Sequence, residues 1–313
     1  MKYLGKDFIF KADRVAPWWQ SHTMAPTAIL LGETIRVFLG CWDSNGISRI
    51  GFIDLQAGDP KMVKAVSDAP VLEIGRPGTF DDNGVFPGHA YAYDGQIYLY
   101  YTGFQLSDKV RHFNFGGLAI SKDGKHFLKT SEAPILDRAD EGLHVRAGQS
   151  VIYQDHRVKS CYSAGTGWLH IGGELRPVYD VHYQESNNFT DFKNKGTRII
   201  ECNLAVEHGL GRPQICSVDN EIYVFYTRRM LDMKYYFGYA KLVRNCGVAE
   251  GGDLEHGSWH RLDSAVTVPF GRQGEFDSDM IYFPSFLQVG NRKYVFYSGN
   301  EFGKGGLGVI RFA

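Results

Sequence analysis

The side chains of this chain that could do chemistry together stand just ahead of short apolar segments of β-strand type. The acidic members are Asp81, Asp82, Glu141, Glu207, Asp277 and Asp279, and the basic members are His22, His144, Arg146 and Arg212. Chemistry at a glycosidic bond needs such a set, because one carboxylic acid protonates the leaving oxygen while another carboxylate acts as base or nucleophile. Trp18 and Trp19 stand ahead of the first segment and could stack on a sugar ring.

The chain repeats one turn-and-strand unit from end to end. The copies read LGETIRVFLG (31–40), DGQIYLYYTG (94–103), QDHRVKSCYS (154–163), VDNEIYVFYT (218–227) and VGNRKYVFYS (289–298). Equivalent residues lie 61 to 71 positions apart, which suits a four-stranded propeller blade with long loops. No long segment has a helical period. The sequence therefore predicts an all-β fold, a single five-bladed β-propeller domain over residues 1–313.

The innermost strand of each propeller blade lines a central channel, so groups just ahead of those strands should meet. We expect Asp82, Glu207, Arg212, Asp279 and His22 to face one cavity at one end of the channel. Carboxylates held close together repel one another, so at least one should have a raised pKa, as a general acid near neutral pH requires. We assign catalysis to Asp82, Glu207 and Asp279. Substrate binding falls to Trp18, Trp19, His22, Asp81, Glu141, His144, Arg146, Arg212 and Asp277.

Each of these residues also has a structural interpretation. Asp81 and Asp82 precede an Asn-Gly pair and could be turn residues, and the acids at 277 and 279 could orient the loop that follows them. The two glutamates could be solvated loop charges, and the histidines and tryptophans could serve packing. Arg212 could pair with a buried carboxylate or bind an acidic group of a substrate. The recurrence of polar groups at one repeat position is the stronger signal.

The two ends of the chain are expected to meet. Residues 6–10 (KDFIF) look like a lone strand ahead of the first full repeat, and the last repeat ends at GLGVIRFA without an outer strand. We therefore expect Asp7–Phe10 to pair near Val309–Phe312 and to close the last blade. Alternation within this strand places Phe8 and Phe10 on one face and Ile9 on the other.

Composition excludes several classes of function. The formal net charge is −1, which gives no electrostatic footprint for nucleic acid or for an anionic membrane. No run of 18 apolar residues is present, so the sequence predicts no membrane span and a cytoplasmic protein. The five cysteines form no CxxC pair, and we expect no metal and no cofactor. Aromatic residues make up 14% of the chain, which suits strands and sugar binding alike.

The sequence resembles the superfamily of five-bladed propellers that holds arabinanases, β-xylosidases, invertases and levansucrases. It is most similar to a branch associated with polysaccharide and O-antigen biosynthesis. The resemblance covers most of the chain and is carried by seven stretches: QSHTMAPT (20–27), GTFDDNGVFPG (78–88), LYYTG (99–103), GLAISKDGKHF (117–127), GRPQI (211–215), FDSDMIYFP (276–284) and FYSGNEFGKGGLG (296–308).

The resemblance implies a glycoside hydrolase or a sugar-transferring enzyme with three carboxylates, one in each of the first three blades. This chain departs from that pattern, because the first-blade position holds His22 and no acid lies between Trp18 and Pro26. Asp82 or Asp81 can stand for the second acid and Glu141 for the third. Asp279 and Glu207 could form a rearranged acid/base pair. A non-catalytic carbohydrate-binding propeller and a protein-interaction propeller are the alternative interpretations.

Overall fold

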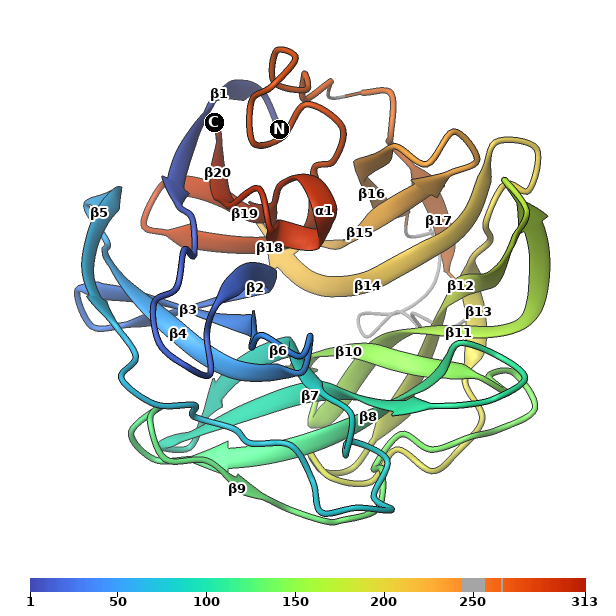
Figure 1. Ribbon diagram of the computed structural model, residues 1–313. Helices are drawn as coiled ribbons and strands as arrows, with labels where there is room; N and C mark the ends of the chain where they lie inside the picture. The colour runs from blue at the N-terminus through green and yellow to red at the C-terminus, as the bar shows by residue number, and fades with distance from the viewer. Residues whose placement is uncertain (244–256, 266) are drawn as a thin grey trace.

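The computed structural model describes residues 1–243, 257–265 and 267–313, and strands dominate it (Figure 1). Consecutive strands pair antiparallel in groups. The first group holds β2 (Ser21–Leu31), β3 (Thr34–Trp42), β4 (Ser48–Gln56) and β5 (Asp59–Val66). The second group holds β6 (Val85–Tyr93), β7 (Gln96–Leu106), β8 (His112–Ser121) and β9 (Leu128–Lys129). The third group holds β10 (Val145–Gln154), β11 (Arg157–Ile171), β12 (Glu174–Ser186) and β13 (Thr197–Ile200). The fourth group holds β14 (Glu207–Val218), β15 (Glu221–Met230), β16 (Tyr235–Val243) and β17 (Ser258–Arg261). The last holds β18 (Tyr282–Val289), β19 (Arg292–Ser298), β20 (Leu307–Phe312) and β1 (Tyr3–Phe10).

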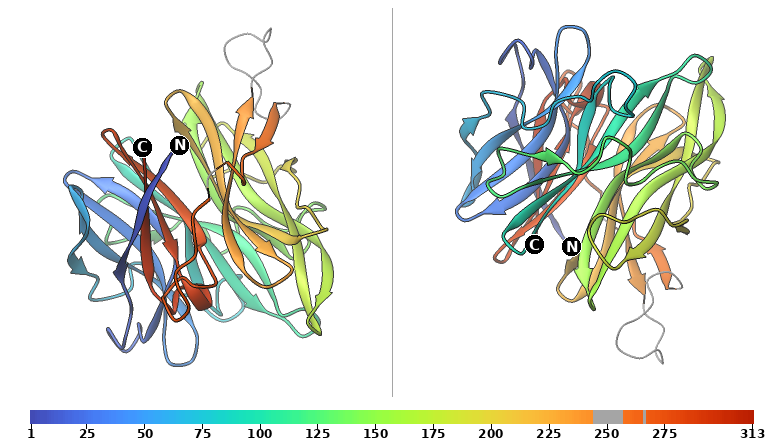
Figure 2. Two further views of the ribbon diagram at one scale, coloured as in Figure 1. Left: turned by 90° about the horizontal axis from the view of Figure 1, so that it is seen from above. Right: turned by 90° about the horizontal axis from the view of Figure 1, so that it is seen from below.

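The first strands of these groups form a closed ring in the middle of the molecule. Strand β2 contacts β6, β6 contacts β10, β10 contacts β14, β14 contacts β18, and β18 returns to β2 (Figure 1). Figure 2 shows the twisted sheets from two further directions, packed beside one another. Sheets arranged radially around such a ring make a β-propeller.

Backbone bulges hold the ring together. Four of the inner strands change register at a residue with positive φ: Ala25, Gly148, Arg212 and Phe283. The backbone N–H of each donates at 2.8 to 3.2 Å to a hydroxyl on the second strand of the preceding group: Ser298, Thr102, Ser163 and Thr227. This contact explains why a serine or threonine follows the tyrosine in four of the repeats. Its hydroxyl oxygen accepts a hydrogen bond from the backbone N–H group that the bulge leaves unpaired.

The N-terminal strand completes the sheet of the last repeat. Strand β1 pairs antiparallel with β20, with Asp7 opposite Val309 and Phe10 opposite Leu307. Ile9 is buried in the core while Phe8 is 48% exposed. Phe10 packs against the same core cluster as Ile9, because the register shifts between Phe8 and Phe10, so the strict alternation expected for this strand is wrong at its end. The pairing joins the first and last strands of the chain without a covalent link.

Few other elements interrupt the strands. The one helical turn among the described residues, α1 (Asn300–Gly303), has left-handed backbone at Glu301 and Phe302. No helix within the described residues is long and apolar enough to cross a membrane. Four cysteines are free thiols, and Cys246 lies outside the described residues.

Candidate functional site

A cavity of about 330 Å³ opens at one end of the ring of inner strands. Each inner strand contributes at least one residue to its wall: Met24, Phe86, Ala147, Gly211 and Tyr282. Most of the other lining residues come from strand ends and from loops on the same side. The cavity therefore lies where the propeller brings all of its repeats together.

Aromatic rings line much of this cavity. They are Trp42, Phe86, Phe104, Trp168, Tyr179, Tyr282, Phe283 and Phe302. The His144 ring lies tilted against Trp168 at 4.2 Å between ring centroids, and His22 stacks on Trp42 at 4.0 Å, so histidines support the two tryptophans. Apolar ring faces with a few placed polar groups are the usual lining of a site for small organic ligands.

Several buried polar atoms at the cavity have no hydrogen-bond partner among the described residues. In the lining these are Trp42 Nε1, Asn114 Oδ1, Arg176 Nε and Arg229 Nε. Two further atoms lie beside it: His144 Nε2, on the ring packed against Trp168, and His208 Nε2, on the ring whose Nδ1 hydrogen-bonds with the Pro177 carbonyl. Buried polar groups are normally paired, so these atoms indicate a place that a polar ligand or water would fill.

The charge of the lining is positive. It holds Arg111, Arg176, Arg212 and Arg229, but only one carboxylate, Glu174. The Glu174 side chain is 65% exposed and forms a 2.5 Å ion pair with Arg176. Burial lowers the pKa of His144 and of His208 to about 4, so both imidazoles are neutral at pH 7. No cluster of described His, Cys, Asp or Glu residues could hold a metal ion.

The structure places three of the predicted substrate-binding acids away from this cavity. Asp81, Glu141 and Asp277 are buried beneath the tyrosine of their own repeat and accept hydrogen bonds from Tyr101, Tyr162 and Tyr297, at 3.1, 3.1 and 2.8 Å. Each also meets a cation: Lys129, Arg146 and Lys6. The recurrence that the sequence displays is therefore largely a repeated structural contact, and it does not bring these acids or Arg146 into the cavity lining.

The fourth repeat uses a different acid for the same contact. Asp263, which follows β17, accepts a 2.9 Å hydrogen bond from Tyr226. The first repeat has Leu39 at the tyrosine position, and the Trp18 ring packs against Gly51, the residue paired with Leu39. Trp19 is fully buried, and its indole N–H donates to the His22 carbonyl at 2.7 Å. Trp19 cannot offer a face to a sugar, and Trp18 serves blade packing.

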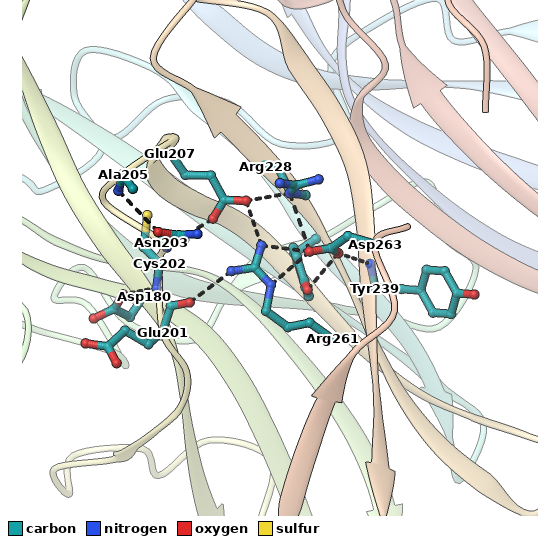
Figure 3. Close-up of polar contacts among 11 residues, drawn as sticks. Asp180, Glu201, Cys202, Asn203, Ala205, Glu207, Arg228, Tyr239, Arg261 and Asp263 are labelled. Atoms are coloured by element: carbon teal, nitrogen blue, oxygen red, sulfur yellow. Dashed lines mark hydrogen bonds and ion pairs between the residues drawn. The ribbon is translucent and has the colours of Figure 1, made fainter. Parts of the chain in front are cut away.

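Glu207 is a buried ion-pair centre and not a general acid (Figure 3). It is fully buried, and Arg228 and Arg261 donate to its Oε1 at 2.5 and 2.6 Å. Burial alone would raise the pKa of Glu207, but the hydrogen bonds and charges of the two arginines hold it below the ordinary value. Glu207 is therefore not a carboxylate with the raised pKa that we expect of at least one member of the cluster, and it stays ionised at neutral pH.

The remaining predicted residues are spread around the cavity. Arg212 lies in its wall, whereas His22 lies behind Trp42. Asp82 precedes the lining residue Asn83, and its Oδ2 accepts the Gly78 N–H at 2.8 Å while its buried Oδ1 has no partner among the described residues. Asp279 is 58% exposed and lies 3.9 Å from Lys234, outside the lining. The single cavity expected to hold all of the catalytic carboxylates is thus not formed.

Sequence reasoning found Arg212 but missed most of the other residues that line the cavity. Trp42, Trp168, Tyr179, Tyr282 and Arg229 all lie within strands, where the sequence shows only ordinary strand-type residues. Two signals were available. Tyr282 stands in FDSDMIYFP, one of the stretches that carry the resemblance, and the pair Arg228–Arg229 puts charged residues at the end of an apolar strand.

Known proteins and solved structures were compared with this chain to find those that share its fold. No family model matches the chain. It is 24% identical over 307 residues to the uncharacterized protein Rv1502 of Mycobacterium tuberculosis, with 96% of each chain covered. A glycosyl hydrolase from Bacteroides ovatus superposes with a TM-score of 0.67 at 15% identity, over 99% of this chain and 96% of the other.

Two further solved structures agree. One belongs to work on the GH130 family of mannoside phosphorylases, which contains glycoside hydrolases that target β-1,2 mannosidic linkages in Candida mannan. It superposes at TM-score 0.69 with 14% identity, over 99% of this chain and 94% of that chain. A GH32 β-fructofuranosidase of Bombyx mori gives 0.62 at 13% identity, over 96% of this chain and 62% of the other. This chain therefore shares the β-propeller fold of these solved structures.

Proposed function

We propose that this protein is a carbohydrate-active enzyme, a single-domain five-bladed β-propeller that binds a saccharide in the central cavity and acts on a glycosidic bond. The closed ring of β2, β6, β10, β14 and β18 supports five blades. The fold shared with glycoside hydrolases supports the reaction class. A role in polysaccharide biosynthesis and a cytoplasmic location remain predictions from the sequence.

The observation that carries this proposal is the pairing of aromatic faces with unsatisfied polar atoms in one cavity. Trp42 and Trp168 offer ring faces, while Asn114 Oδ1 and the Trp42 Nε1 group are buried without partners among the described residues. A sugar ring has apolar faces and a rim of hydroxyl groups that both donate and accept. It therefore satisfies such a surface better than a purely apolar ligand does.

Two carboxylates are the best candidates for acid and base. Asp82 has one oxygen fixed by the Gly78 N–H and one buried oxygen free, next to the lining residue Asn83. Glu174 is the carboxylate within the lining itself. The neutral imidazole of His144, behind Trp168, can hydrogen-bond a sugar hydroxyl through its unpaired Nε2.

A second candidate function is saccharide binding without catalysis. It is favoured by one specific observation: the cavity lining holds a single carboxylate, whereas chemistry at a glycosidic bond ordinarily uses a facing pair. A propeller that only binds saccharides would need the aromatic and polar cavity, but it would not need a facing pair of carboxylates.

The test incubates the protein with a panel of oligosaccharides of different linkages and follows products by chromatography and mass spectrometry. Turnover that Asp82→Asn or Glu174→Gln abolishes, with Asp279→Asn as the matched control outside the cavity, would support the enzyme. Binding in titration calorimetry without turnover would replace it with the binding function. Absence of both would overturn the proposal.

A further inference from the structure

Arg229 differs from two buried arginines, Arg36 and Arg146, because no described carboxylate lies within ion-pair distance of it. Arg36 pairs with Asp54 at 2.7 Å, and Arg146 pairs with Glu141 at 3.0 Å. The Arg229 guanidinium instead donates to two tyrosine hydroxyls, Tyr179 at 2.5 Å and Tyr235 at 2.9 Å. Its Nε group is buried with no partner among the described residues. A cation taken out of water without a counter-charge is costly, so this placement calls for an anion.

A second unneutralised charge lies in the same cavity wall. Arg212 donates to the carbonyl oxygens of Pro26, Pro87, Phe283 and Pro284 and to Thr27 Oγ1. These acceptors use all five of its N–H groups, so Arg212 ties the inner strands together and has no donor left for a ligand. No described carboxylate lies within ion-pair distance of it, so its positive charge adds to the potential at the cavity.

Tyrosine hydroxyls complete a set of hydrogen-bond donors. The Tyr179 oxygen accepts from Arg229, so its hydroxyl hydrogen must point elsewhere, and Tyr179 lines the cavity. Tyr282 also lines the cavity and brings a second phenol hydroxyl to it. Its ring stacks on Tyr235 at 5.1 Å between centroids, which places it beside the second tyrosine that Arg229 contacts. The cavity thus offers N–H and O–H donors around a positive charge.

We propose that Arg229, with the hydroxyls of Tyr179 and Tyr282, forms an oxyanion-binding subsite in the central cavity. Its ligand is a carboxylate or phosphate group, which arrives either on an acidic saccharide or as free phosphate. The proposal rests on the proposed function only in that the saccharide occupies the same cavity. An arginine fork suits either group, because it presents parallel N–H donors to two oxygens.

The experiment measures binding by titration calorimetry at low salt with three probes. These are inorganic phosphate, a neutral oligosaccharide, and a counterpart of the same length that carries a uronate or a phosphate group. The wild-type protein should bind the charged counterpart about 10- to 100-fold more tightly than the neutral one, as charge-assisted hydrogen bonds predict. Arg229→Gln should remove that preference, so that the charged and neutral probes bind with similar affinity.

Two further variants keep the test decisive. Arg138→Gln removes an exposed guanidinium that lies 4.6 Å from the Phe113 ring centroid, and should change nothing. Tyr282→Phe keeps the buried ring and removes one donor, so it should weaken the charged probe several-fold even if Arg229→Gln fails to fold. Binding of inorganic phosphate that Arg229→Gln abolishes would identify free phosphate as a ligand. If the protein prefers the charged saccharide over the neutral one but does not bind inorganic phosphate, the ligand of the subsite is an acidic group on the saccharide.

The outcomes separate this subsite from the proposed function. If charged and neutral probes bind wild type equally and phosphate does not bind, the subsite is wrong while saccharide binding stands. If phosphate binds through Arg229 but no saccharide does, the subsite stands and the proposed function fails. If Arg229→Gln folds but weakens every probe equally, Arg229 supports the wall and does not recognise an anion.

Discussion

The hydroxyl of Tyr297 donates a 2.8 Å hydrogen bond to the buried carboxylate of Asp277. Lys6 reaches the same carboxylate oxygen at 2.5 Å from the N-terminal strand, so one acid joins β19 to β1. Burial raises the pKa of Tyr297 strongly, and the charge of Asp277 acts in the same direction, so the phenol remains a donor. Equivalent bonds join Tyr101 to Asp81, Tyr162 to Glu141 and Tyr226 to Asp263.

Asp277→Ala should destabilise the protein without touching the cavity. It leaves the Lys6 ammonium, 15% exposed, without its partner, and breaking a buried ion pair costs about 3–5 kcal/mol. Urea unfolding should therefore show a clearly lower midpoint than wild type. Asp279→Ala, at a carboxylate 58% exposed, should stay within about 0.5 kcal/mol. Equal shifts in the two variants would contradict the structural role of Asp277.

Gly308→Ala should also be destabilising, because a Cβ there would lie 2.5 Å from Cζ of Tyr297. Gly308 pairs with Tyr297 across β19 and β20, and Gly117 stands in the same relation to Tyr101. We expect a loss of about 1–3 kcal/mol from this overpacking. Gly58→Ala is the matched control, since nothing lies within 4 Å of its Cβ. A Gly308→Ala protein as stable as wild type would show that the tyrosine can move aside.

The pairing of β1 with β20 predicts how the N-terminus contributes to stability. Ile9→Ala removes a side chain only 8% exposed and should cost about 2–5 kcal/mol in unfolding free energy. Leu4→Ala, in the same strand but 53% exposed, should cost far less. Deleting residues 1–10 should lower the melting temperature more than either change, because it exposes the edge of β20. A truncated protein with the wild-type melting temperature would be incompatible with this pairing.

Buried histidines make stability depend on pH below neutrality. Burial lowers the pKa of His208 and of His144 to about 4, and that of His89 to about 3. The unfolded chain binds these protons near pH 6.5, so it holds more protons than the native state between pH 6.5 and 4. Stability should therefore fall as the pH falls through this window, by up to about 1.4 kcal/mol per unit for each histidine.

Urea midpoints at pH 7.0 and pH 5.0 check this dependence. His208→Gln should reduce the difference between the two midpoints, because it removes a buried group that the unfolded state protonates. His126→Gln, at an imidazole 86% exposed, is the control and should leave the difference unchanged. A His208→Gln protein with the full wild-type difference would exclude His208 as a contributor.

Trp168→Ala should weaken saccharide binding by about tenfold, because it removes a ring face from the cavity wall and the support for His144. Trp18→Ala removes a ring of equal size that packs on Gly51 away from the cavity. It should lower stability and leave affinity unchanged. Calorimetric titration of both variants with one oligosaccharide measures the contrast. Equal loss of affinity in both would place the binding site elsewhere.

The sequence alone was enough to predict that the fold consists of β-strands, that one turn-and-strand unit repeats, and that the two ends of the chain pair. Those features are local or periodic: strand-type residues, polar turns, and an apolar strand at one end that lacks a neighbour. The repeated tyrosine was visible for the same reason. Its contact with Asp81, Glu141 or Asp277 was not, because hydrogen-bond partners 20 or 21 residues apart depend on how the strands fold back on one another.

Only the tertiary structure decided which polar groups are structural and which face the cavity. Glu207 and Asp279 stand at similar places in their repeats, yet one is fully buried between two arginines and the other is 58% exposed. Burial and charge balance are set by neighbours from several strands at once, and no spacing along the chain encodes them. For the same reason Arg229, an ordinary strand residue in the sequence, becomes an unbalanced charge in the cavity wall only when β12, β15 and β16 bring Tyr179 and Tyr235 to its guanidinium.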